Sequence, residues 1–341
     1  MKKIIYYITD HGKGHATRSL AIIKELQKSQ FEVIIRNSNA KKMIEYEIPN
    51  AKIIPGITDV GPVINKDGMS IDEKKSNKEI SKWVNNINLY STKELELFSK
   101  IKPDLIISDI SPMPLIAAKK FEVPSIAISN FSWYDVLKFL PREILEKLKI
   151  SYNNADLAIK LPLGTEMAHF RNRKTVGIVS RNISKNKKQI KQELDVKNTT
   201  RIVLFALGGS DHVLKCKKGN NIEFITLNTK INSKIKTLPI HNVYDAQNYV
   251  SMADLVVGKC GYGFISECLT NGTPFFYVAS DSHAEQMGID ADLVKRGFSS
   301  RKTLEEIDKM KFDSEFLDNI KKPTKVKNNL ESLIKYVKEF F

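Results

Sequence analysis

IIYYITDHGKGHATRSL (residues 4–20) joins a run of five apolar residues to a helical pattern with apolar side chains at positions 20, 22, 23 and 26. A strand that turns into a helix leaves backbone N–H groups unpaired at the positive end of the helix dipole, and anions bind there. Gly12 and Gly14 allow a sharp turn and the close approach of a ligand. His15 stands where the helix begins, and its imidazole exchanges protons near neutral pH. This turn, with His11 and Arg18 beside it, is the first candidate for chemistry.

The length and composition indicate a globular protein of two domains. The chain has 341 residues, of which 42% are hydrophobic and 27% charged. No run approaches the roughly 18 apolar residues that span a bilayer, and the apolar run at 4–8 is typical of a first strand rather than a secretory signal. Three cysteines without metal-ligand or redox spacing suit a reducing compartment. We expect a cytoplasmic protein and leave open a peripheral position at the membrane.

The net charge of +15 does not point to nucleic acid. Residues 1–165 carry 25 basic and 19 acidic side chains and the remainder carry 29 and 20, so the excess is not gathered in one stripe. The densest basic run, residues 181–191, has no aromatic side chains on which bases would stack. We interpret this run as a solvated linker or helix face, with contact to an anionic membrane as the alternative.

Strand and helix patterns alternate along the whole chain. Apolar runs with little alternation, such as residues 105–107, are typical of strands covered on both faces, so the sheets should be mostly parallel. A second series of the same kind begins at residue 201. We predict an α/β protein of two Rossmann-like domains facing across a cleft, with a site outside the carboxyl ends of the strands. The predicted segments are an N-terminal domain at 1–165, a C-terminal domain at 166–322 and a helix at 323–341 that packs back on the first domain.

The expected elements follow from the same patterns. In the first half we expect strands at 4–8, 32–35, 53–54, 105–107 and 125–128, and helices from about 16, at 76–99 and at 114–121. In the second half we expect strands at 201–207, 222–227, 255–257 and 274–278, and an amphipathic helix at 326–341.

Two loops of the second half suit a nucleotide diphosphate. One follows the strand at 201–207 and contains Gly208, Gly209 and Ser210, where the backbone can approach a phosphate. The other follows the strand at 255–257 and leads into a helix, whose N–H groups can hold a diphosphate. Lys259 would neutralise part of the charge, and Glu267 would accept hydrogen bonds from ribose hydroxyls. The expected donor-binding residues are Gly14, Gly208, Gly209, Ser210, Lys259, Gly261, Tyr262, Gly263 and Glu267.

A third loop adds polar side chains after the strand at 274–278. His283, Glu285 and Gln286 lie at the start of the next helix, where we expect them to bind the donor sugar. Plain helix capping is the alternative for this segment. Asp290 and Asp292 have metal-like spacing but sit two apart in a helical pattern, where side chains do not face each other, so we predict no metal site.

The first half should supply the base. Asp109, directly after a buried strand, would hold His15 in one tautomer and raise its basicity, although Asp before Ser-Pro is also ordinary turn chemistry. On the acceptor side we expect His11, Arg18, Asn130 and Trp133, with aromatic packing in the core as the alternative for the ring at 133.

Four blocks in order, at residues 11–18, 130–133, 156–162 and 258–263, resemble the N-terminal glycosyltransferase-like domain of the plant L-arabinokinase family. The resemblance implies the glycosyltransferase B (GT-B) fold and its binding scaffold. No sugar-kinase pattern follows in this sequence, so the kinase activity is not carried over. The second half is also similar to the donor domain of bacterial lipid-linked N-acetylglucosaminyltransferases, which implies that Glu267 binds ribose, residues 261–263 the diphosphate, and Glu285 and Gln286 the sugar.

These observations together predict a metal-independent, inverting glycosyltransferase of hexosyl or N-acetylhexosaminyl type, using a nucleotide-diphosphate sugar such as a UDP-sugar and no cofactor. His15 would remove the proton from an acceptor hydroxyl as it attacks the anomeric carbon. The motif at 12–18 is also similar to one in UDP-sugar hydrolases, so hydrolysis with water as acceptor is an alternative. A nucleotide-sugar binding module without catalytic activity is the second alternative. The acceptor is not identified by the sequence.

Overall fold

The computed structural model describes the 341 residues except 13, 66–67, 69, 209–210, 241 and 299. It divides into two compact units. Unit 1 comprises Met1–Val63, Ile71–Val179 and Asn328–Phe341, and unit 2 comprises Ile64–Ser70 and Ser180–Lys327. The boundary expected at residue 165 falls inside unit 1, because the segment that follows it contributes a further strand to the sheet of that unit.

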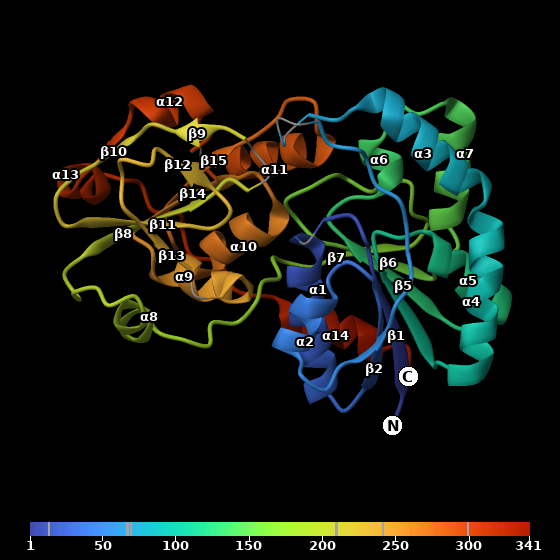
Figure 1. The fold of residues 1–341 in the computed structure, drawn as a ribbon. Coiled ribbons are helices and arrows are strands. Elements are labelled where there is room, and N and C mark those ends of the chain that lie inside the picture. The colour runs from blue at the N-terminus through green and yellow to red at the C-terminus, as the bar shows by residue number, and fades with distance from the viewer. Residues whose placement is uncertain (13, 66–67, 69, 209–210, 241, 299) are drawn as a thin grey trace. The chain divides into compact units, whose positions relative to one another are not determined.

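The core of unit 1 is a seven-stranded sheet (Figure 1). Its strands are β1 (Lys3–Ile8), β2 (Glu32–Arg36), β3 (Lys52–Ile54), β4 (Leu105–Asp109), β5 (Ser125–Ser129), β6 (Leu157–Lys160) and β7 (Arg173–Thr175). They pair in parallel in the order β3-β2-β1-β4-β5-β6-β7. Ile5 of β1 lies between Ile34 and Ile106, and it is fully buried. Both faces of the central strands are therefore covered, as their unbroken apolar runs predict.

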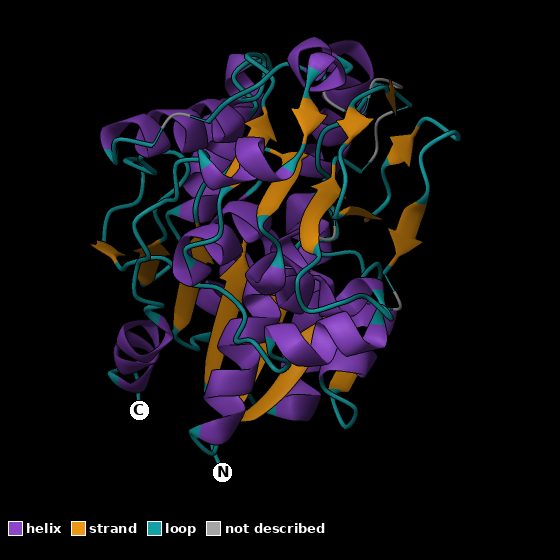
Figure 2. Cartoon of the chain, turned by 90° about the vertical axis from the view of Figure 1, so that its left-hand side faces the viewer, coloured by secondary structure: helices purple, strands orange, loops and turns teal. Residues whose placement is uncertain are grey.

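Helices cover both faces of this sheet (Figures 1 and 2). On one face α1 (Gly14–Lys28) packs against α2 (Lys41–Glu47) and α14 (Leu330–Lys338). The other group contains α3 (Glu73–Asn85), α4 (Ile87–Ile101), α5 (Met113–Phe121) and α7 (Arg142–Tyr152), with the short α6 (Trp133–Val136) packed on α7. The apolar side of α14 is buried against α1, so the last helix of the chain belongs to unit 1.

The prediction of one long helix at 76–99 is wrong, because this segment forms two helices. Asn86 ends α3 and precedes α4, with non-helical backbone angles of φ −103° and ψ 7°. Its side-chain amide donates to the carbonyl of Lys82 at 2.8 Å. An asparagine that bonds its local backbone competes with helix continuation, and the apolar periodicity on either side does not reveal the break.

Unit 2 repeats the architecture with a smaller sheet. Its strands are β8 (Arg201–Ala206), β11 (Ile222–Thr226), β13 (Thr237–Pro239), β14 (Leu255–Lys259) and β15 (Phe275–Val278), which pair in parallel in the order β13-β11-β8-β14-β15. Two short parallel pairs join β10 (Lys217–Lys218) to β16 (Lys311–Phe312) and β9 (Val213–Leu214) to β12 (Lys230–Ile231). The helices are α8 (Lys187–Glu193), α9 (Ala246–Met252) with the 3₁₀ turn η1 (Val243–Asp245), α10 (Tyr262–Asn271), α11 (Ala284–Lys295), α12 (Leu304–Lys309) and α13 (Ser314–Asp318).

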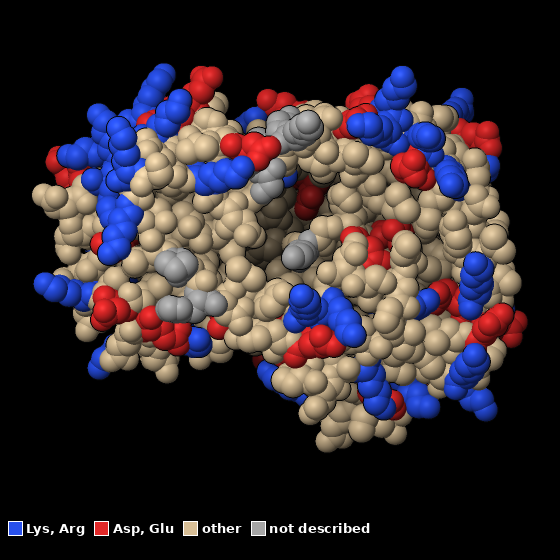
Figure 3. Space-filling model, viewed as in Figure 1, with Lys and Arg blue, Asp and Glu red and all other residues tan. Residues whose placement is uncertain are grey.

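The basic run at 181–191 forms part of a helix. Asn186 and Gln189 make a reciprocal capping box that starts α8. Lys187 and Lys188 are exposed as predicted, whereas Lys191 is buried. In Figure 3, basic and acidic side chains are interspersed over both units on the face shown. Within the described ranges, no helix combines the length and apolar character needed to cross a bilayer.

Candidate functional site

In unit 1, polar residues gather where three neighbouring strands end. The residues after β1, the end of β4 and the residues after β5 lie side by side, because β1, β4 and β5 are adjacent and parallel. At their centre Arg18, from α1, forms a buried ion pair with Asp109, at 2.8 Å from Nε to Oδ2 and 2.5 Å from Nη2 to Oδ1. Arg18 also donates to Asn130 Oδ1, and Ser19 Oγ donates to Asp109 Oδ2 at 2.6 Å. Arg18 is 1% exposed and Asp109 0%, so a bidentate contact satisfies this buried charge.

Asp109 does not form a hydrogen bond with His15, so the prediction that Asp109 directly holds the His15 ring is wrong. The Nδ1 atom of His15 lies 3.9 Å from Asp109 Oδ1 but 3.0 Å from Nη2 of Arg18. Because a guanidinium only donates, Nδ1 is the acceptor and a neutral His15 carries its proton on Nε2. Arg18 therefore fixes the His15 tautomer, and Asp109 acts on His15 through Arg18.

Four aromatic rings form a row beside this ion pair. His15 packs edge-on against Phe131 with ring centroids 5.4 Å apart, and Phe131 packs in the same way against Trp133 at 5.4 Å. His11 closes the row at 5.3 Å from Trp133. A Cβ at Gly61 would lie 2.2 Å from the His11 ring, so the glycine is needed for the ring to sit there. The structure thus brings together all the acceptor-side residues predicted from sequence, while Phe131 and Trp133 are nearly fully buried as a core would have them.

Asp59 is a member of this site that the sequence analysis missed. Its carboxylate accepts hydrogen bonds from Thr9 Oγ1 at 2.7 Å, from the Asp10 backbone N–H at 3.1 Å and from Trp133 Nε1 at 2.8 Å. Burial raises its pKa to about 6, and the hydrogen bonds from Trp133, Thr9 and Asp10 only partly offset this desolvation. Asp59 lies in a loop after α2 and β3 with no apolar pattern of its own, so no local signal marks it.

The turn after β4 is strained. Ile110 has φ 70°, a conformation in which a β-branched side chain is rarely found. The hydroxyl of Tyr152 donates to the Ile110 carbonyl at 2.7 Å and accepts from the Trp133 backbone N–H at 3.0 Å. The turn that presents Asp109 is therefore tied to the segment that carries the aromatic row.

In unit 2, the ends of β8, β14 and β15 are likewise adjacent. Gly208 follows β8, and a Cβ there would meet Asn228 Cβ at 3.2 Å, which leaves little room for a larger residue. The predicted donor-binding residues Gly209 and Ser210 lie outside the described residues. Gly14, predicted for the same role, lies in unit 1, as the first residue of α1.

The loop after β14 leads into α10 as predicted. Gly261 is the N-cap of α10 in an extended conformation, and as a glycine it has no side chain that could cap the first turn. The nearest described atom to a Cβ at Gly261 would be the Lys259 carbonyl at 3.9 Å, so a ligand can approach this backbone. Tyr262 is buried and Gly263 lies in the first turn. Lys259 Nζ donates to the Gly68 carbonyl.

Glu267 lies in the interior of unit 2 and holds an arginine. Its Oε1 accepts from Arg181 Nε at 2.7 Å, and both side chains are more than nine-tenths buried. Arg181 Nη1 also donates to the Tyr244 carbonyl at 2.8 Å. Sequence reasoning assigned Arg181 to a solvated basic run and did not foresee this pair. Ribose binding by Glu267 stays a prediction.

The loop after β15 places a buried histidine at the start of α11. His283 is the N-cap, 9% exposed, and its Nδ1 has no hydrogen-bond partner among the described residues. Burial lowers the pKa of His283, so the ring is neutral at physiological pH. Gln286 Oε1 accepts from the Ser280 N–H at 2.8 Å, and the Gln286 carbonyl lies 3.8 Å from Cys260 Sγ. The contact between Cys260 and Gln286 joins the segments after β14 and β15, while Glu285 is only half-buried.

The two aspartates with metal-like spacing are held separately. Asp290 accepts from the hydroxyl of Tyr277, and Asp292 lies 3.6 Å from Arg296 Nη2 on the same helix. The described part of the chain contains no group of three or more histidine, cysteine or acidic residues arranged to hold a metal ion.

Comparisons with known proteins agree with this architecture. The sequence model of a protein family, Glycosyl transferase family 1, matches residues 2–197 of this chain. L-arabinokinase of Arabidopsis thaliana is 27% identical over 305 residues, which are 82% of this chain and 28% of that protein. The chain thus spans less than a third of the length of this curated relative.

Among solved structures, the glycosyltransferase SnogD from Streptomyces nogalater matches with a TM-score of 0.63, 11% identity and coverage of 100% of both chains. The glycosyltransferase SsfS6 from Streptomyces sp. SF2575, complexed with thymidine diphosphate, matches with a TM-score of 0.60 and 14% identity over 99% of this chain and 100% of that chain. These likenesses, with the two parallel sheets, confirm the predicted GT-B fold.

Proposed function

The chain belongs to glycosyl transferase family 1, and from this premise we propose that it transfers a sugar from a nucleotide-diphosphate sugar to a hydroxyl acceptor. The observation that carries the proposal is the pair of helix starts after the adjacent strands β14 and β15. One is a glycine cap open to a ligand, and the other holds a buried histidine with an unpartnered nitrogen. A diphosphate accepts hydrogen bonds at several oxygens, and helix N-termini supply donors and positive potential.

We infer that unit 2 binds the donor. The first N–H groups of α10 would hold the diphosphate, with Lys259 adding a positive charge, and His283 would hydrogen-bond the sugar or the phosphate next to it. These donors stabilise negative charge on the departing diphosphate by themselves, so we propose departure without a metal ion. The thymidine diphosphate bound to SsfS6 supports a pyrimidine nucleotide, and a UDP-sugar stays our expected donor.

Unit 1 would meet the acceptor with the partly exposed rings of His11 and His15, which pack against the buried rings of Trp133 and Phe131. For Nε2 of His15 to accept a proton, Nδ1 would have to carry the other proton, and Arg18 opposes this by donating to Nδ1. We therefore propose that His15 contacts the acceptor hydroxyl, and that action as a base requires the Arg18 contact to open. Direct displacement at the anomeric carbon by this hydroxyl would invert the configuration.

Thermal-shift measurements with UDP, TDP, ADP, GDP and their sugars test the donor site, because a ligand that binds only the folded state raises the melting temperature. We expect a shift with a pyrimidine nucleoside diphosphate that is reduced in His283→Ala. His212→Ala is the control, because His212 lies in the same unit but contacts Asp308. If none of these nucleotides raises the melting temperature, the donor assignment is wrong.

Turnover assays distinguish a glycosyltransferase from a hydrolase and from a binding module. Transfer requires an acceptor, whereas release of free sugar in water alone would identify a hydrolase, and binding without turnover across an acceptor panel would identify a binding module. His15→Ala should reduce turnover by about 10²–10⁴-fold while nucleotide binding is retained. A pH profile of kcat/KM with an ionisation in the wild type that is absent from His15→Gln would support a base. Anomer-resolved NMR of the product tests inversion.

A further inference from the structure

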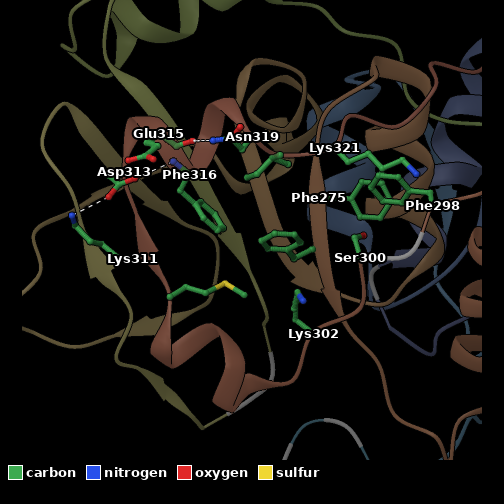
Figure 4. Close-up of a pocket in the computed structure, with 13 residues that line it drawn as sticks. Phe275, Phe298, Ser300, Lys302, Lys311, Asp313, Glu315, Phe316, Asn319 and Lys321 are labelled. Carbon is green, nitrogen blue, oxygen red and sulfur yellow. Dashed lines mark hydrogen bonds and ion pairs between the residues drawn. The ribbon is translucent and has the colours of Figure 1, made fainter.

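A cavity of about 660 Å³ lies in unit 2 beside the edge strand β15 (Figure 4). It is mainly apolar, and the apolar side chains that line it are Phe275, Phe276, Phe298, Met310, Phe316 and Ile320. Its volume lies within the range of about 300–1,000 Å³ that is usual for small-molecule sites. None of its lining residues belongs to the loops after β8 and β14 or to the start of α11. The cavity is therefore separate from the proposed donor site.

Ser300 places a buried hydroxyl in this cavity. The residue is 8% exposed, and its Oγ has no hydrogen-bond partner among the described residues. The segment around it runs parallel to β15, because Tyr277 pairs with Arg301 and the Lys302 N–H donates to the Tyr277 carbonyl at 2.9 Å. In an extended segment, residues two apart lie on the same side, so Ser300 and Lys302 both face the cavity. A buried hydroxyl without a partner is unfavourable, and a ligand acceptor would relieve it.

The charges around the cavity are separated. In Figure 4, Ser300, Lys302 and Lys321 lie on one side, and Asp313 and Glu315 lie on the other. Lys321 Nζ donates to the Gly297 carbonyl at 2.7 Å, which holds its ammonium group at the rim. Lys302 Nζ lies 5.8 Å from the centroid of the Phe276 ring and 3.6 Å from the carboxylate of Glu306. The acidic side is partly neutralised, because Lys311 pairs with Asp313 at 2.9 Å.

From these features we propose that the cavity binds an organic anion with an apolar body, such as an acyl chain that carries a carboxylate or a phosphate. The phenyl rings would cover the apolar body. The head group would accept a hydrogen bond from Ser300 Oγ and interact with the ammonium groups of Lys302 and Lys321. A carboxylate and a phosphate monoester share this chemistry, and the proposal does not depend on which nucleotide sugar the protein uses.

Isothermal titration calorimetry of the full chain tests the proposal with four probes below their micelle concentrations: decanoate, decyl phosphate, decanol and inorganic phosphate. We expect saturable binding of decanoate or decyl phosphate, and the tighter one identifies the head group. Decanol, which lacks the charge, and inorganic phosphate, which lacks the chain, should each bind at least about tenfold more weakly. Absence of saturable binding by both anions, or equal binding of decanol, overturns the proposal.

Variants localise the binding. Ser300→Ala should raise the melting temperature of the unliganded protein, because it removes an unpartnered buried hydroxyl, and should weaken anion binding about tenfold. Lys321→Gln should also weaken it, whereas Lys309→Gln, an exposed lysine of α12 outside the lining, should not. Nucleotide-induced thermal shifts should be the same in all three variants, which separates this site from the donor site. Anion binding unchanged in both Ser300→Ala and Lys321→Gln would contradict the assignment.

Discussion

Replacing Asp59 by asparagine should change how the stability of unit 1 depends on pH. In the folded protein, burial raises the pKa of Asp59 from 3.8 to about 6. Between these values the folded state holds a proton that the unfolded chain has released, so the free energy of unfolding falls as pH rises through this window. The shift is about two pKa units at about 1.4 kcal/mol each, so the full effect is about 3 kcal/mol.

Asparagine imitates the protonated carboxyl, because it is neutral and can donate to Thr9 Oγ1 while its oxygen accepts from Trp133. The stability of Asp59→Asn relative to wild type should therefore increase by up to about 3 kcal/mol between pH 4 and pH 7 and be constant above pH 7. Urea unfolding followed by tryptophan fluorescence measures this difference. Both tryptophans of the chain, Trp83 and Trp133, lie in unit 1, so the signal reports that unit alone.

Asp104→Asn is the matched control. Hydrogen bonds from Lys2 Nζ and the Lys3 N–H hold the pKa of Asp104 below its usual value, so the stability that this group contributes is present above about pH 4 and is lost only as pH falls below that value. The stability of Asp104→Asn relative to wild type should therefore be nearly constant between pH 4 and pH 7 and rise only below about pH 4. A stability difference for Asp59→Asn that is as constant between pH 4 and pH 7 as that of Asp104→Asn would refute the reasoning about the buried carboxyl.

Three further results are expected. Arg18→Met leaves Asp109 buried without its counter-charge, so it should lower the free energy of unfolding, measured in urea, by about 3–5 kcal/mol. The double variant Arg18→Met/Asp109→Leu should restore most of this loss. A loss below about 1 kcal/mol in Arg18→Met would show that the pair is not buried as described. Gly164→Ala should lower stability by about 1–3 kcal/mol or more, because the new Cβ would lie 1.9 Å from the Asn130 carbonyl, whereas Gly14→Ala, with no described atom within 4 Å, should not. Burial raises the pKa of the thiols of Cys216, Cys260 and Cys268. The native protein should therefore not react with a thiol reagent at pH 8, whereas the unfolded protein should react at all three positions. Rapid reaction of the native protein would contradict the burial of these cysteines.

Local patterns were enough to predict which segments become strands and where the polar loops follow them. The runs at 105–107 and 255–257 are apolar on both faces, which is typical of central parallel strands in an α/β protein, and both form such strands. The glycine-rich segments after β1 and β14 lead into helices as predicted. The same patterns did not reveal the break at Asn86, because apolar periodicity continues through it. They also did not foresee β7, which is three exposed, polar residues at the edge of the sheet.

The amino-acid sequence by itself determined the order of the elements, the two parallel sheets and the loops that carry polar residues, because hydrophobic periodicity and turn chemistry depend on neighbours along the chain. Only the tertiary structure decided which side chains that lie far apart in the sequence contact each other. Arg18 meets Asp109 across 91 positions, Arg181 meets Glu267 across 86, and Trp133 meets Asp59 across 74. Each of these contacts requires strand order, helix packing and burial to bring two side chains together. For this reason the tautomer of His15, the pKa of Asp59 and the apolar cavity beside β15 follow from the folded structure alone.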